Sequence, residues 1–276
     1  ATYVSGTSEV VYQVISVNAA CIGNIATNAN LVEHYYTAIL RRPSDAPGKA
    51  FWSSEADRLC ALGADPKAVF AVMASAFFNS AEYVGFDRDD NGFIADLYDA
   101  SFSRQPDWEG SSYWLSQLFA GMPTDTVMSW FLFSPEFTET MNAAFPGQTA
   151  RAETYLVLNL YGGLFRRLAD TGGYTYWTEQ FRTAQCDANP AAAVRDVLNG
   201  ASSSFVGGAE YTDQATTDSE YVVDLYYALL HRGAEPDGYN FWVRNAASRE
   251  NAWRVFVASP EMQAQIEAIA AQGCLQ

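Results

Sequence analysis

The sequence predicts an all-α protein built from four tandem repeats of about 62 residues. A phrase of Arg, two residues, an acid, two residues, Gly, three residues and Trp occurs four times without insertion. Each phrase follows an apolar run at helical spacing that contains Tyr. The copies are Arg42-Asp45-Gly48-Trp52, Arg104-Asp107-Gly110-Trp114, Arg167-Asp170-Gly173-Trp177 and Arg232-Glu235-Gly238-Trp242. Their tryptophans are 62, 63 and 65 residues apart.

Each repeat is expected to contain three helices. The first helix carries the Tyr and is followed by the acidic Gly turn, and the second helix starts near the Trp. The third helix leads to a short closing cap. This cap consists of a small residue, any residue, Glu and a large apolar residue. The four caps are Ser80–Tyr83, Ser134–Phe137, Gly208–Tyr211 and Ser259–Met262. The expected divisions are an N-terminal segment 1–30, repeats 31–84, 85–147 and 148–211, and a fourth repeat with the C-terminal tail at 212–276.

The N-terminal segment lies outside the repeats. Thr7 resembles a helix start, but the following residues are β-branched or aromatic. We expect a helix packed on the first repeat, and a strand that joins a neighbouring molecule is the alternative. The stretch from Asn24 to Asn30 is predicted to be a polar linker.

The repeats alternate in length. The distance from the Trp to the Glu of the cap is 30, 22, 33 and 19 residues in the four copies. The two long copies share an insertion, 64–66 and 188–190, that ends in Pro. The unit of duplication is therefore predicted to be a pair of repeats, with the seam between the halves at 142–149.

The repeated residues are best explained by the fold, because all four copies keep them. We expect the Gly to take a positive φ in the turn and the acid to cap the next helix. The Arg is expected to form a bidentate pair with this acid or with the Glu of the cap, and the Trp to fill the core. Ser134 and Ser259, each followed by Pro and Glu, are predicted N-caps. Four acidic turns acting as ligand loops are the functional alternative.

Composition excludes some classes of function. The chain has 32 acidic and 16 basic residues, a net charge of −16, so nucleic acid is a poor partner. No apolar stretch is long enough to span a bilayer, and the chain begins at Ala1, as a processed or trimmed protein would. The two histidines, His34 and His231, are expected on helix surfaces. No nucleophile or phosphate-loop motif is present, so we predict a protein that is not an enzyme; a paired-carboxylate glycosidase stays open.

The four cysteines are not spaced as zinc or redox pairs. We predict two disulfides, Cys21–Cys60 and Cys186–Cys274, each joining a terminal segment to a loop. Other pairings and four buried thiols are the alternatives. Disulfides would place the protein outside a reducing cytosol.

One loop resembles the start of a calcium-binding loop. Asp87, Asp89 and Asn91 alternate, Gly92 permits a sharp turn, and Phe93 offers its carbonyl oxygen. The twelfth position departs from that motif, because it holds Tyr98 instead of Glu, although Asp96 could substitute. Calcium is the possible cofactor, and a plain acidic helix entry is the alternative.

The Tyr-bearing helix, the Arg-to-Trp phrase and the closing Ser-Pro-Glu-Phe resemble the DUF4214 family, a mostly bacterial repeat. The resemblance covers roughly residues 31–262. It implies an all-helical fold that is similar to phycobilisome linker domains, and a place in large secreted, cell-surface or surface-layer proteins. It implies no reaction.

We therefore expect a non-enzymatic structural or assembly module that is secreted or displayed on a cell surface. Its partners would be other proteins or copies of itself. A calcium-dependent adhesion module is one alternative, with Trp108 as its glycan-binding residue, because no other copy has an aromatic residue at that position. A scaffold like a phycobilisome linker is the other.

Overall fold

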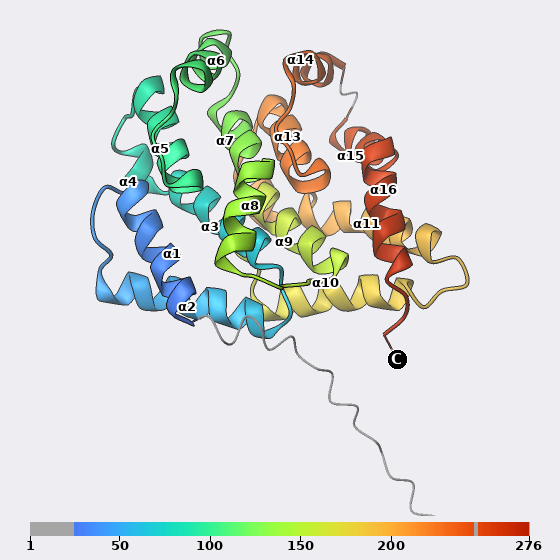
Figure 1. The fold of residues 1–276 in the computed structure, drawn as a ribbon. Coiled ribbons are helices and arrows are strands. Elements are labelled where there is room, and N and C mark those ends of the chain that lie inside the picture. The colour runs from blue at the N-terminus through green and yellow to red at the C-terminus, as the bar shows by residue number, and fades with distance from the viewer. Residues whose placement is uncertain (1–24, 246–247, 276) are drawn as a thin grey trace, which may run out of the picture.

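The computed structural model describes residues 25–245 and 248–275, and this part of the chain contains helices and no strand (Figure 1). Every repeat has the same order of elements. Repeat 1 contains α1 (Ile25–Ala38), α2 (Ala46–Ala61), α3 (Pro66–Phe78) and α4 (Ala81–Val84). Repeat 2 contains α5 (Asp90–Phe102), α6 (Trp108–Phe119), α7 (Thr124–Leu132) and α8 (Pro135–Ala144).

Repeats 3 and 4 continue this order. Repeat 3 contains α9 (Ala152–Phe165), α10 (Thr171–Ala184), α11 (Pro190–Phe205) and α12 (Ala209–Thr212). Repeat 4 contains α13 (Asp218–Leu225), which continues into the π-helical η2 (Tyr226–Leu230), then α14 (Pro236–Asn245), α15 (Arg249–Val257) and α16 (Pro260–Ala271). The all-α repeat fold is confirmed. In each repeat the closing cap begins a fourth helix in addition to the three that were expected.

The alternation of long and short repeats appears in helix length. The third helices α3 and α11 have 13 and 16 residues, whereas α7 and α15 have nine each. The fourth helices compensate, because α4 and α12 have four residues whereas α8 and α16 have 10 and 12. Repeats 1 and 3 thus share one arrangement, and repeats 2 and 4 share another.

Two expectations near the N-terminus have different outcomes. Residues 25–30 were expected in a linker, but they form the first two turns of α1. That expectation was wrong because Asn28 is buried and its amide donates to Asp57 at 2.6 Å, so the polar stretch packs on α2. The predicted helix or strand that starts at Thr7 lies outside the described residues.

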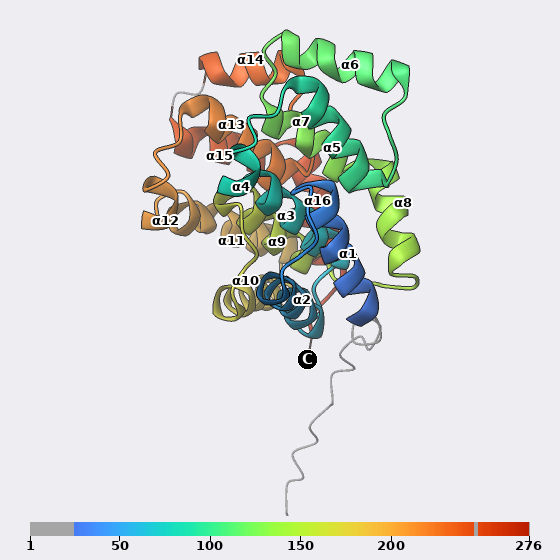
Figure 2. The same cartoon turned by 90° about the vertical axis from the view of Figure 1, so that its left-hand side faces the viewer.

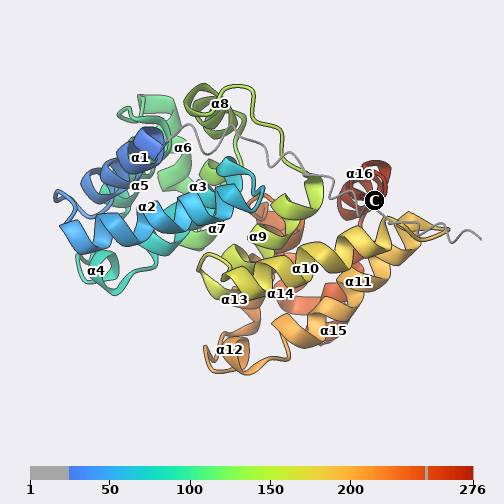
Figure 3. The same cartoon turned by 90° about the horizontal axis from the view of Figure 1, so that it is seen from below.

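The centre of the molecule is α9, which packs against α3 of repeat 1 and against η2 of repeat 4 (Figure 3). Gly162 and Gly163 make these approaches possible. A Cβ at Gly162 would lie 2.5 Å from Val72, and one at Gly163 would lie 2.9 Å from Ala228. At Gly162 the two halves of the chain therefore approach closely, and at Gly163 α9 approaches η2 within the second half.

The second helices of the repeats occupy two opposite edges of the molecule. In Figure 1, α2 and α10 run along the bottom, and α6 and α14 lie at the top. Figure 2 shows α6 and α14 again along one edge, across the molecule from α2 and α10. The second helices of repeats 1 and 3 therefore form one edge, and those of repeats 2 and 4 form the other.

Candidate functional site

The acid of the repeated phrase caps the second helix, as expected. Asp45, Asp107 and Asp170 each precede the first helical residue, and each accepts the backbone N–H of the Gly three residues later at 2.8–2.9 Å. This hydrogen bond lowers the pKa of all three carboxyls. In the fourth copy the acid is Glu235, which pairs with Arg232.

The expected conformation of the repeated Gly was wrong. Positive φ values occur at other glycines, whereas Gly48, Gly110, Gly173 and Gly238 lie in the first turn of their helices. A Cβ at each of these four positions would overlap the phenol oxygen of the Tyr on the preceding helix. The Gly is needed because the Tyr hydroxyl contacts the backbone of the helix start.

The left-handed conformation is found one residue before each repeated Arg. Arg41, Ser103, Arg166 and His231 have φ values of 52–56°. These residues end the first helix and turn the chain towards the cap. Because none of them is Gly, the position does not appear in a search for glycine turns, and sequence reasoning missed it.

The repeated Arg joins the turn to the closing cap. Arg42 donates to both carboxylate oxygens of Glu82, at 2.6 and 2.8 Å, and Arg104 donates to both oxygens of Glu136, at 2.7 and 2.9 Å. The same bidentate pairs occur in the other copies, between Arg167 and Glu210 and between Arg232 and Glu261. Each Arg also pairs with the capping acid. The Arg therefore pairs both with the capping acid and with the Glu of the closing cap, which the sequence offered as two alternatives.

Aromatic rings complete each cluster. Each guanidinium lies over the Tyr ring of the first helix at 4.8–5.1 Å from its centroid. The Trp packs at 5.1–5.3 Å against a Phe of the third helix, which also contacts that Tyr. The packing Phe residues are Phe77, Phe131, Phe205 and Phe256. The repeated residues therefore join four helices, which supports the structural interpretation of the phrase.

The fourth cluster borders a surface hollow of about 410 Å³. Tyr226, Trp242 and Phe256 form its apolar wall, and Arg232 and Glu261 form part of its rim. The guanidinium and the carboxylate pair with each other here, so they contribute little unbalanced charge.

Charged residues also join the two repeats of each half. Arg41 pairs with Asp96, and Arg166 pairs with Asp224 at 3.1 Å, so the left-handed residue of a long repeat reaches the first helix of the next short repeat. Both carboxylates are buried and accept a Tyr hydroxyl, from Tyr83 at 3.1 Å and from Tyr211 at 2.6 Å. Burial raises the pKa of Asp224 to about 7, although Arg166 opposes the shift.

The two histidines have defined positions between helices. His34 Nε2 lies 3.0 Å from the carbonyl oxygen of Asp99 and so joins α1 to α5. The expectation of a helix-surface position is wrong for His231, whose ring lies against Phe133 and Tyr155. Burial lowers the pKa of His231 to about 3, so its ring is neutral at pH 7.

A cavity of about 330 Å³ lies at the seam between the halves. Asp65 and Lys67 of repeat 1, Arg151 and Tyr155 of repeat 3, and His231 of repeat 4 contribute to its lining. His231 Nε2 is shielded from solvent and has no hydrogen-bond partner among the described residues. The two cations of the lining are already paired, Lys67 with Asp65 and Arg151 with Glu153.

The predicted calcium ligands have other roles in the described residues. Asp89 caps α5 by accepting Gly92 N–H at 2.8 Å, and Phe93 is buried inside that helix. Asp96, the possible substitute for the twelfth ligand, is held by Arg88 at 2.9 and 3.0 Å and by Arg41. Within 25–245 and 248–275, no group of three or more His, Cys, Asp or Glu side chains could hold a metal ion. Calcium binding at Asp87, Asp89 and Asn91 stays a prediction.

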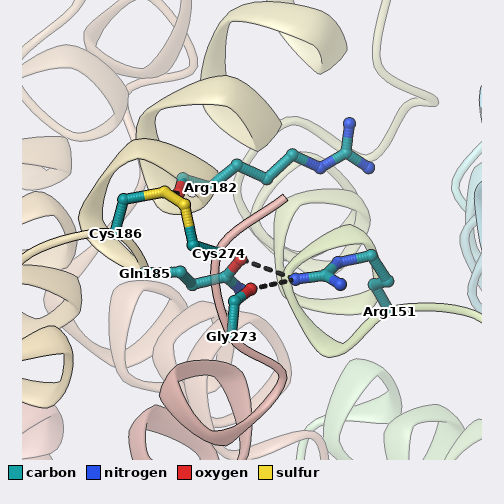
Figure 4. Close-up of a disulfide and its surroundings, with 6 residues drawn as sticks. All are labelled: Arg151, Arg182, Gln185, Cys186, Gly273 and Cys274. Carbon is teal, nitrogen blue, oxygen red and sulfur yellow. Dashed lines mark hydrogen bonds between the residues drawn. A yellow bond between two sulfur atoms is a disulfide. The ribbon is translucent and has the colours of Figure 1, made fainter. Parts of the chain in front are cut away.

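One predicted disulfide is present. Cys186, in the loop after α10, bonds to Cys274 in the tail after α16 across 88 residues (Figure 4). Arg151 beside it donates to the side-chain oxygen of Gln185 at 2.6 Å and to the carbonyl oxygen of Gly273 at 3.1 Å. The C-terminal tail is therefore attached to repeat 3 beside the boundary between the two halves. In the other predicted pair Cys60 is not a free thiol, and Cys21 lies outside the described residues.

Exposed aromatic residues distinguish the two edges of the molecule. The residue before each Trp is exposed to almost the same extent, 54–56%, at Phe51, Tyr113, Tyr176 and Phe241. On α6, Trp108 and Phe119 add exposures of 84% and 94%. Neither α6 nor α14 contains a buried residue, whereas α2 and α10 each contribute buried side chains to the core.

Trp108, the predicted glycan residue, is thus well exposed, but it does not adjoin the acidic loop. The loop begins α5, and the turn that leads to Trp108 follows its other end. A 13-residue helix is about 20 Å long. A single site that uses both features is therefore not formed by this fold.

The family comparison agrees with the repeat structure. The domain of unknown function DUF4214 matches residues 71–141 and 202–266. The chain carries two copies of the DUF4214 domain. Each copy starts in the third helix of a long repeat and ends in the last helix of a short one, so the DUF4214 match has the same two-fold duplication as the fold.

No curated protein and no solved structure matches this DUF4214 chain. The similarity to phycobilisome linker domains therefore stays an expectation. Among the described residues, no helix combines the length and apolar character needed to cross a membrane.

Besides the left-handed residue before each repeated Arg, sequence reasoning missed three further features of the DUF4214 units. The ion pairs of Arg41 with Asp96 and of Arg166 with Asp224 could have been inferred from the sequence. An additional Arg stands immediately before the repeated Arg in the two long repeats and in neither short repeat. The contact between the repeated Gly and the Tyr had a signal too, because their separation is constant at 12 residues. No sequence signal marked the exposed side of α6, because the exposure of a helix depends on the neighbouring helices.

Proposed function

We propose that this protein is a non-enzymatic assembly module that binds other proteins or copies of itself outside the cytosol. The observation that carries the proposal is the edge formed by α6 and α14. Two whole helices without a buried residue display Trp108, Tyr113, Phe119 and Phe241 to solvent. Exposed aromatic residues that are gathered on one edge are typical of protein-binding surfaces.

The motif residues support the same proposal. Arg, acid, Gly and Trp in each copy are occupied in capping, ion pairing and ring packing. They therefore explain the fold without a catalytic role. The Cys186–Cys274 disulfide supports a location outside the reducing cytosol, because such bonds persist in oxidising compartments.

The experiment is a measurement of particle mass by light scattering, first with calcium and then with EDTA. We expect an assembly larger than the 30.3 kDa chain in both solutions. An assembly that dissociates in EDTA would assign a function to Asp87, Asp89 and Asn91. A monomer in both solutions, at every concentration tested, would contradict self-assembly.

Glycan-dependent adhesion is the second candidate, and the exposure of Trp108 favours it. An aromatic ring exposed at the start of a helix can stack on the apolar face of a sugar. Retention on immobilised glycans by the wild type but not by Trp108→Ala, with unchanged circular dichroism, would support adhesion. Equal retention of both proteins would contradict it.

A further inference from the structure

We infer that α6 is a self-complementary helix that pairs in antiparallel orientation with α6 of a second copy. The inference rests on the proposed assembly function and names its contact. It is based on three properties of the exposed side of α6: the positions of its aromatic rings, the small residues between them and the small number of charges.

The aromatic rings lie at the two ends of one stripe. At 100° per residue, Trp108, Ser112 and Phe119 lie within about 40° of one another around the helix axis, and Ser116 lies about 40° farther round. All four are exposed. The stripe therefore has an aromatic ring at each end and two serines between them, over about 18 Å of helix.

This order of residues is nearly the same in both directions along the helix. A two-fold axis near residue 114, perpendicular to the helix, would place Trp108 beside Phe119 of the second copy. It would place Ser112 opposite Ser116, where small side chains allow the helices to approach closely. Ser116 already donates its hydroxyl to the carbonyl oxygen of Tyr113 at 2.6 Å, so burial would leave that donor satisfied.

Charge favours this surface over the rest of the molecule. Two chains that each carry a net charge of −16 repel one another. Glu109 is the one charged residue within α6, so the repulsion is small where the stripes meet. Glu109 and the capping Asp107 lie at the same end of the helix. Antiparallel pairing therefore separates the acids of the two copies, whereas parallel pairing would bring them together.

The available area is compatible with a weak dimer. The two rings of the stripe, Trp108 and Phe119, are 84% and 94% exposed. At roughly 150–250 Å² for a fully buried aromatic side chain, they offer on the order of 350 Å² per copy. A standard interface uses about 800 Å² per partner. We therefore expect a dimer that dissociates at low protein concentration.

The first test compares matched surface variants of the full chain. In Trp108→Ser/Phe119→Ser the stripe loses both rings, and in the control Phe51→Ser/Tyr176→Ser two exposed aromatic residues are lost from the opposite edge. We expect light scattering to give a mass of about twice 30.3 kDa for the wild type and the control. The α6 variant should show at least about a tenfold weaker association, with unchanged circular dichroism and melting temperature.

Disulfide trapping tests the orientation. Because the wild type has no free cysteine among its described residues, introduced thiols can be followed. An equimolar mixture of Ser112→Cys and Ser116→Cys chains should form a covalent dimer on oxidation, and neither variant alone should do so efficiently. Efficient trapping of each variant alone would overturn the antiparallel arrangement.

The outcomes separate this inference from the proposed function. An assembly with the same mass in the α6 variant as in the wild type would overturn α6 pairing and leave the assembly function in place. A wild type that is monomeric at all concentrations would overturn both α6 pairing and self-assembly.

Discussion

The second helices of repeats 1 and 3 contribute buried side chains to the core, whereas those of repeats 2 and 4 contain no buried residue. The same phrase starts all four helices, with the same ion pairs and the same Trp–Phe contact. The difference comes from the third helix. A 16-residue α11 is about 24 Å long and can support α10 over its length, whereas a nine-residue α7 is about 14 Å long and supports one part of α6.

This comparison shows that one local motif can serve two purposes. In the long repeats it starts a helix that contributes one side to the core. In the short repeats it holds a helix against the body at the Trp and leaves the remainder of that helix exposed to solvent. Four sets of variants test this difference.

The largest difference is expected between equivalent tryptophans. Trp177 is 9% exposed, whereas Trp114 of the short repeat is half-buried. Trp177→Ala should lower the free energy of unfolding by about 3–5 kcal/mol because it leaves a cavity. Trp114→Ala should lower it by roughly 1–2 kcal/mol because less apolar area is lost. Urea unfolding followed by circular dichroism measures both, and equal losses would contradict the comparison.

The second prediction concerns the pair that joins a long repeat to a short one. Arg166→Ala leaves the buried Asp224 without its cation, so we expect a loss of about 2–3 kcal/mol at pH 7. Adding Asp224→Asn should recover part of it, because the amide can still accept the hydroxyl of Tyr211. A double-mutant cycle on urea midpoints gives the coupling. Strictly additive losses would show that the pair does not join the repeats.

The third prediction tests whether the turn is equivalent in both kinds of repeat. Gly173→Ala and Gly110→Ala each place a Cβ against a Tyr hydroxyl, on Tyr161 and Tyr98. Both should cost about 2 kcal/mol, because the ring must move. Gly172→Ala is the control, since its Cβ would lie 3.4 Å from the nearest atom. Unequal melting temperatures for the first two variants would show that repeat length alters the turn.

The smallest effect concerns the residue before the repeated Arg, which is Arg in the long repeats and His231 in the fourth. The folded pKa of His231 is depressed to about 3 from 6.5, so the unfolded chain takes up the proton first as pH falls. Between pH 6.5 and pH 3 this contribution destabilises the folded protein progressively. It should reach about 1.4 kcal/mol at pH 5.5.

The measurement is the melting temperature of the wild type and of His231→Asn between pH 7 and pH 5. Asn tolerates the left-handed backbone and does not titrate in this range. The decrease on acidification should be smaller in the variant. If the melting temperatures of the two proteins fell equally with pH, this would contradict the lowered pKa of His231.

The sequence by itself determined the repeat, the helix starts and one disulfide. These depend on contacts between residues close in the chain or kept in fixed register, such as Asp45 with the N–H of Gly48 or Ser134 with that of Phe137. The pairing of Arg42 with Glu82 was foreseen as one of two options, because a recurring spacing marks residues that act together.

The tertiary structure alone decided why the Gly is kept, where His231 lies and which second helices stay exposed. Each depends on atoms from another helix: the Tyr hydroxyl above the Gly, the rings of Phe133 and Tyr155 around His231, and the length of the third helix beneath α6 or α10. Amphipathic spacing shows that a helix has an apolar side, but burial depends on whether a neighbour is long enough to cover that side.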